Sequence, residues 1–154
     1  MTTMTTQRKF DGNQIGGDLL LSSVRELERV MGPPGAKPHP PTDFDAMGEA
    51  LRRLHAQVRI HGATEVIPGH SDPAVPPHPE VAEDLSRLRD EHTAILGQLD
   101  RLIRVVDTMS DRAPEDKEVF FMRARELAAI VRRHLAEEDR LFVIAEWRDT
   151  GGES

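Results

Sequence analysis

A regular stripe of core-facing positions over residues 120–145 constrains the fold of this chain more than any other feature of its sequence. Its positions are spaced alternately by four and three residues, as in a helix packed into a bundle: Phe120, Ala124, Leu127, Val131, His134, Glu138, Leu141 and Ala145. Two consecutive positions of this otherwise apolar stripe are His134 and Glu138. A buried carboxylate without a compensating partner costs several kcal/mol, roughly the whole stability of a small domain. The stripe therefore predicts a binding partner for this pair, and a metal ion is the simplest candidate.

Three further stretches carry stripes of the same spacing, at about residues 14–31, 43–67 and 79–109. Glycine and proline end the first two, and Thr42 or Asp43 is a suitable N-cap for the second. Residues 110–114 turn the chain into the fourth helix, which is expected over about residues 114–147. Because no stretch shows sustained alternation of apolar and polar residues, the sequence predicts an all-α protein. The expected architecture is an antiparallel up-down four-helix bundle with long Pro-rich connections.

The expected domain organisation is simple. Residues 1–13 are polar and are predicted to form a flexible N-terminus, residues 14–148 form the bundle, and residues 149–154 form a flexible tail. The two Pro-rich connections are wide enough to allow a crossover or a swapped homodimer.

Composition limits the chemistry and the partners of this chain. It contains no cysteine, which excludes disulfides, thiolate zinc sites, iron–sulfur clusters and cysteine catalysis. A metal must then be held by histidine and carboxylate, which suits iron, manganese or zinc. A net charge of −7 argues against nucleic acid and anionic membranes as partners. Since no apolar run approaches the ~18 residues of a membrane span, a soluble cytoplasmic protein is expected.

The bundle topology places further polar residues at the depth of His134. In an up-down bundle, residues equidistant from a tight turn lie at the same height, and His92 and His134 are centred on residue 113, inside the predicted turn. By the same reasoning His61 and His92 are centred inside the second Pro-rich connection. Glu65 and Glu138 each follow a histidine by four residues, about 6 Å along the axis at ~1.5 Å per residue. Three imidazoles at one level and two carboxylates at the next predict a metal site like those held between facing helices of bundles.

These motifs resemble the hemerythrin-like (HHE cation-binding) family, most clearly over residues 84–143. Asp90-Glu-His92 resembles the family's Glu-His helix, and His134-Leu-Ala-Glu-Glu138 resembles its His-x-x-x-Glu helix. Residues 43–68 match more weakly, through His61 and Glu65. The resemblance implies a non-haem iron site, possessing one or two irons, that binds oxygen, nitric oxide or peroxide.

The chain departs from the family pattern in two places. The first helix of the family normally supplies a histidine, and this chain has Val24 at the expected position. The third helix lacks a second ligand in its stripe one turn from His92. The candidate metal ligands are His61, Glu65, His92, His134 and Glu138, with Asp139, His55 and Glu91 as alternatives. Because this set is too small to fill two six-coordinate irons, a single metal, a weakly held second metal and a decayed site all remain open.

Three hypotheses follow from the sequence. The leading one is a non-haem iron protein that binds or senses a small diatomic or peroxide ligand. The second is a metal-free bundle acting as an interaction or assembly module, in which His134 and Glu138 form a buried hydrogen-bonded pair. The third is a structural zinc site; manganese is a further alternative to iron. Because no nucleophile or acid–base constellation is visible beyond the metal set, the sequence does not establish an enzyme.

Overall fold

A computed structural model describes residues 3–33, 43–64 and 79–149 of the chain. Side chains are described for residues 17–33, 43–62, 79 and 81–144. The four α-helices are α1 (Thr3–Met31), α2 (Phe44–Thr64), α3 (Pro79–Val106) and α4 (Pro114–Asp149), and a short 3-10 helix, η1 (Met109–Asp111), precedes α4.

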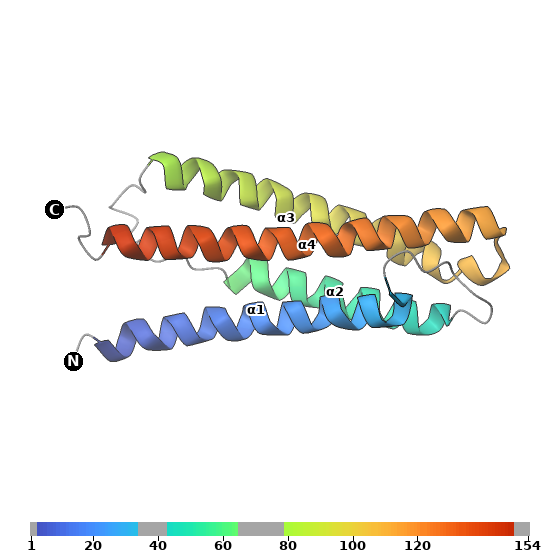
Figure 1. The fold of residues 1–154 in the computed structure, drawn as a ribbon, viewed down its shortest axis with the longest axis horizontal. Helices are drawn as coiled ribbons and strands as arrows, with labels where there is room; N and C mark the ends of the chain where they lie inside the picture. The colour runs from blue at the N-terminus through green and yellow to red at the C-terminus, as the bar shows by residue number, and fades with distance from the viewer. Residues whose placement is uncertain (1–2, 34–42, 65–78, 150–154) are drawn as a thin grey trace.

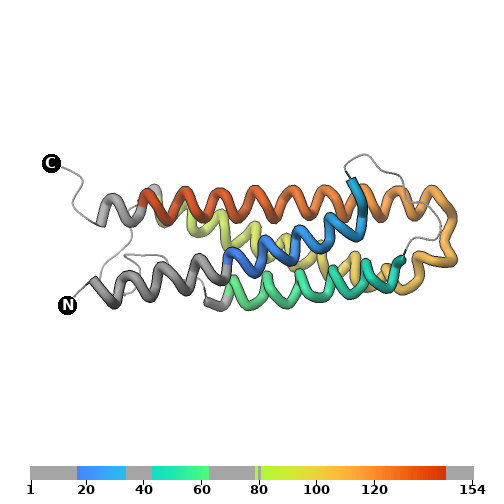
Figure 2. The backbone as a smooth tube through the Cα atoms, turned by 60° about the horizontal axis from the view of Figure 1, so that its bottom comes forward, coloured from blue at the N-terminus to red at the C-terminus, as the bar shows by residue number. Residues whose placement is uncertain are grey.

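The helices form an antiparallel up-down bundle, as the sequence predicted (Figure 1). Each helix packs against the next along the chain, and α4 closes the bundle by packing against α1. Figure 2 shows α1 lying between α4 and α2. α2 and α4 are therefore diagonal neighbours that meet across the core, which matters for the site below. Among the described residues, no helix has the length and apolar character needed to cross a bilayer.

Local sequence signals explain most helix ends. The carboxylate of Asp43 accepts a hydrogen bond from the backbone N–H of Ala46 at 2.9 Å, which confirms the predicted N-cap of α2. Gly32 ends α1 with φ of 82°, a left-handed conformation that glycine adopts without steric cost. Pro79 and Pro114 begin α3 and α4, where the missing N–H of proline removes no helical hydrogen bond.

Three described boundaries differ from the sequence prediction, and one of them is the end of α3, which lies at Val106 rather than near residue 109. α1 begins at Thr3 rather than near residue 14. The sequence did not predict its first turns because they carry no apolar stripe. α4 extends to Asp149, two residues beyond the predicted end. The Pro-rich connections fall largely at residues 34–42 and 65–78, which lie outside the described residues together with Glu65 and Thr42.

The apolar core consists of two clusters of buried side chains. The main cluster fills the bundle between all four helices and includes Phe44, Phe120 and Phe121, whose rings pack edge to face with centroids 6.0–6.3 Å apart. The minor cluster consists of Val81, Leu85, Leu88 and Leu141, from the start of α3 and the end of α4. Between the clusters the stripe of α3 passes through His92 and that of α4 through His134 and Glu138. A layer of polar side chains therefore separates the two apolar clusters.

Candidate metal centre

The polar layer, defined here as His61, His92, His134 and Glu138, is built around a carboxylate that faces two imidazoles. Glu138 Oε2 is in direct contact with His61 Nε2 on the diagonally opposite helix α2. Glu138 Oε1 lies 2.7 Å from His134 Nε2, one turn earlier on α4. His61 and His134 are only 4% and 2% exposed, and the Glu138 side chain is 10% exposed. One carboxylate thus joins two buried imidazoles across the core.

Helix α3 contributes two neighbouring residues to the same level. The ring of His92 lies beside that of His134, with centroids 5.9 Å apart and ring planes inclined at 44°. Glu91 Oε1 lies 3.3 Å from His134 Nδ1, an ion-pair distance without hydrogen-bond alignment. Each ring nitrogen of His134 therefore faces a carboxylate, one from its own helix and one from α3.

The protonation state of His92 suits metal binding. Burial lowers the pKa of His92 below its usual value, and the neighbouring His134 and His61 lower it further, against an opposing effect of Glu138. An imidazole with a lowered pKa is neutral at pH 7, and the neutral form is the one that binds a metal.

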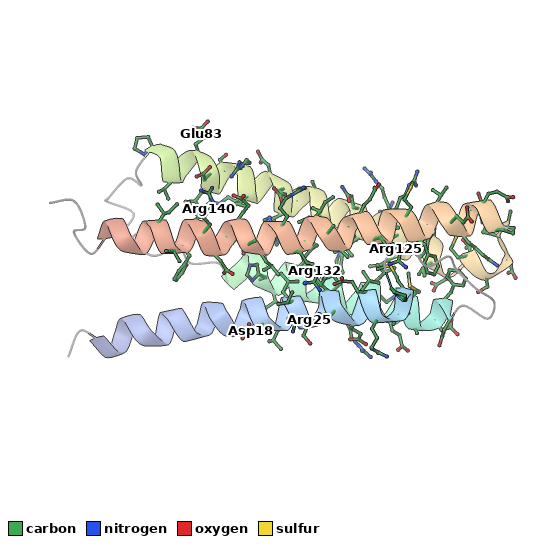
Figure 3. The ribbon with its side chains drawn as sticks, in the orientation of Figure 1. Asp18, Arg25, Glu83, Arg125, Arg132 and Arg140 are labelled. Carbon is green, nitrogen blue, oxygen red and sulfur yellow. The ribbon has the colours of Figure 1, made fainter. Side chains whose placement is uncertain are left out.

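The alternative ligands from the sequence lie in different surroundings. His55 Nε2 lies 2.9 Å from Asp100 Oδ1 on α3, six residues before His61. Asp139 is exposed, and the pKa of its carboxyl is raised by partial burial and by the nearby carboxylates of Glu138 and Asp18, against a lowering effect of His61. Figure 3 shows Asp18 on α1.

Helix α1 contains no histidine, and its stripe is apolar at the level of the polar layer. Val24, which stands where the resemblance implied a histidine, is completely buried. The described part of α1 therefore contributes packing to this region.

The structure brings His61, His92, His134 and Glu138 together and adds Glu91 at the edge of the layer. Within residues 3–33, 43–64 and 79–149, no group of three or more histidine or carboxylate side chains is arranged to hold a metal ion. Glu138 instead contacts His61 and His134 directly. The residue types nevertheless suit a metal ion: two buried imidazoles, the half-buried imidazole of His92 and a carboxylate that is 10% exposed are ligands that iron, manganese and zinc accept.

Sequence reasoning did not single out Gly62, which follows His61 on α2. The tip of the His92 ring lies where a side chain at this position would begin. The available signal was a glycine inside a helix, next to a core histidine.

Comparison with known families assigns this chain to a family. The family model described as Hemerythrin HHE cation binding domain matches residues 20–144, which is more than half of the chain. No curated protein and no solved structure matches. The chain belongs to the hemerythrin HHE cation-binding domain family, as its Glu-His and His-x-x-x-Glu motifs indicated.

Proposed function

We propose that this protein is a non-haem iron protein that binds or senses oxygen, nitric oxide or peroxide. The observation that carries the proposal is Glu138, whose two oxygens face the imidazoles of His61 and His134 in a buried layer. A buried carboxylate placed between imidazoles from two helices is suited to holding a cation, and membership of a cation-binding family supports the same reading.

In this proposal the polar layer holds one or two irons. His61, His134 and Glu138 would hold the metal from two helices, and His92 would add a third imidazole from α3. Glu65, expected from the sequence four residues after His61, would add a second carboxylate. When bound, iron supplies coordination positions that a small ligand can occupy and a redox-active centre. Glu91 lies on the other side of the His134 ring, with its Oε1 atom 3.3 Å from His134 Nδ1.

Iron content tests the proposal directly. Protein produced with iron and purified in air should contain one or two irons per chain and show ligand-to-metal charge-transfer absorption that changes when nitric oxide is added. His134→Ala and Glu138→Ala should each lose this iron. His55→Ala is the matched control, because His55 pairs with Asp100 outside the layer, and it should keep wild-type iron content. Wild-type protein that takes up no iron on reconstitution would contradict the proposal.

A second candidate function is a metal-free assembly module. It is favoured by the burial of Val24 at the place of the first family ligand and by the direct contacts that already join His61, Glu138 and His134. On this reading, combined His134→Ala and Glu138→Ala substitutions leave self-association or partner binding intact. Sedimentation of the double variant beside the wild-type protein distinguishes the two functions, provided that iron content is measured on the same samples.

A further inference from the structure

The imidazole of His92 occupies the space above Gly62 on the neighbouring helix. A Cβ atom built on Gly62 would lie 2.2 Å from His92 Nε2, 2.7 Å from Cε1 and 2.9 Å from Cδ2. Non-bonded carbon atoms pack at about 3.5–4.0 Å, so even the methyl group of alanine cannot share this space with the ring. The present position of His92 therefore requires a glycine at residue 62.

The close approach distinguishes Gly62 from the other helical glycines of the described side chains. A Cβ on Gly17 or Gly97 would meet nothing within 4 Å apart from its chain neighbours and the nearby backbone of its own helix. A Cβ on Gly48 would come within 2.9 Å of the Arg52 guanidinium, the far end of a flexible side chain on a helix surface. At Gly62 the obstructing group is a candidate metal ligand, and relief of the clash must move that ligand.

The position of Gly62 also links two candidate ligands. It directly follows His61, so one turn of α2 provides both an imidazole and the space that a second imidazole from α3 fills. The ring in that space lies 5.9 Å from His134 and within electrostatic range of His61 and Glu138. Apart from proline, glycine is the residue that least favours a helix. The close approach of the His92 ring explains why α2 has a glycine at residue 62.

We propose that Gly62 is a positioning residue of the metal centre: the absence of a side chain at residue 62 lets His92 lie against α2, in the same layer as His61 and His134. This inference rests on the proposed metal-binding function. A side chain at residue 62 pushes the imidazole out toward α3 and away from the other donors, while the helices keep their packing. Gly62 itself touches no ligand and acts only through His92.

The experiment compares Gly62→Ala with Gly97→Ala, each alone and in a His92→Ala background. Gly97→Ala is the matched control, because it makes the same chemical change inside a helix where the new methyl group meets open space. Iron affinity is measured by titration of metal-free protein. Stability is measured on the metal-free variants by urea unfolding, and the environment of the His92 ring is followed by its imidazole NMR signals.

Gly62→Ala should weaken iron binding at least about tenfold, the lower range for loss of a residue that orients a metal ligand. It should also shift the His92 ring signals, and Gly97→Ala should do neither. In the His92→Ala background the clash is absent, so Gly62→Ala should leave the remaining iron affinity unchanged and should raise the urea midpoint, because alanine favours the helix. With the His92 ring present, Gly62→Ala should instead lower the urea midpoint, because the new methyl group meets the ring. A glycine needed only for the conformation of α2 would not show this change of sign.

Three results would overturn the inference. The first is a Gly62→Ala variant that binds iron as well as Gly97→Ala does. The second is a Gly62→Ala substitution that lowers the urea midpoint equally with and without the His92 ring, since the ring would then not be the obstacle. The third is wild-type protein that takes up no iron, which defeats the proposed function itself; the unfolding data on metal-free protein still show whether the clash exists, so the two failures are distinguishable.

Discussion

The two halves of α4 follow the same spacing of core positions but bury different chemistry. From Phe120 to Val131 the stripe is entirely apolar and packs in the main cluster. From His134 onward it passes through the polar layer before it returns to an apolar side chain at Leu141. The periodicity, and with it the helix, is unchanged between the halves.

The first half of α4 therefore supplies apolar packing that stabilises the bundle, and the second half supplies the polar side chains of the candidate site. Apolar burial stabilises the first half, since each fully buried large side chain contributes about 1.5–3 kcal/mol. The polar layer gives up part of that stabilisation, because removing imidazoles and a carboxylate from water costs free energy that their mutual contacts must offset. Substitutions that remove apolar side chains from the first half, or make the polar layer apolar, test this division.

The largest expected effect is in the apolar half. Phe120→Ala removes a ring that is 3% exposed and packs against Phe44 and Phe121, and it should cost about 3–5 kcal/mol of unfolding free energy. Urea unfolding of metal-free protein measures this loss. Met122→Ala, two residues away and 53% exposed, is the control and should change stability by less than about 0.5 kcal/mol. Equal losses in the two variants would show that the main cluster is not the source of stability.

Making the polar layer apolar should have the opposite sign. Replacing His61, His134 and Glu138 together by leucine should stabilise the metal-free protein by about 1–4 kcal/mol, since buried polar clusters are often less stabilising than packed apolar side chains. The same variant should bind no iron. Glu138→Leu alone should instead destabilise by about 1–3 kcal/mol, because it leaves buried imidazoles without their carboxylate. A triple variant less stable than the single one would show that the layer supports the fold.

A smaller effect is expected at the end of α1, beside the apolar half of α4. Arg125 on α4 donates hydrogen bonds to the carbonyls of Met31 at 3.0 Å and Gly32 at 3.2 Å, and Figure 3 shows it between the two helices. Arg125→Met keeps much of the aliphatic stem and should cost about 1–2 kcal/mol in urea unfolding. Arg123→Met, on the exposed face of α4, should be close to neutral. A neutral Arg125→Met would mean that these bonds do not stabilise α1.

The smallest effect is expected for the surface ion pair between α4 and α1. Arg132 donates to Glu28 through Nε at 2.8 Å and through a terminal nitrogen at 2.6 Å, with both side chains about two-fifths exposed. A double-mutant cycle with Arg132→Ala and Glu28→Ala should give a coupling of about 0.2–1 kcal/mol that shrinks in high salt. A coupling that salt does not reduce would indicate that the pair is shielded from solvent.

Much of the fold and part of the candidate site could be predicted from the sequence. The stripes predicted four helices, and the sequence offered Thr42 or Asp43 as the N-cap of the second, of which Asp43 caps α2. The symmetry of His92 and His134 about the turn predicted that their rings lie at one level, and the rings are neighbours. These predictions succeed because helical periodicity and tight turns fix which residues share a face and a height.

The contacts within that level could not be predicted in the same way. His55 and His61 lie on the same helix, and nothing in their spacing shows that one pairs with Asp100 and the other with Glu138. Glu91 lies beside the stripe of core-facing positions on α3, and it faces His134 Nδ1 because of the rotation of α3 about its own axis. Helix rotation and side-chain rotamers depend on packing against neighbours, which a single sequence stripe does not encode.

The sequence by itself determined that this chain forms four helices with polar residues at one depth of the core, and that any metal there must be held by histidine and carboxylate. Only the tertiary structure decided that Glu138 reaches diagonally to His61 while it faces His134, and that His92 lies where Gly62 leaves room. The physical reason is that the height of a residue along a helix is a property of the chain, whereas the distance across a bundle depends on how all four helices pack together.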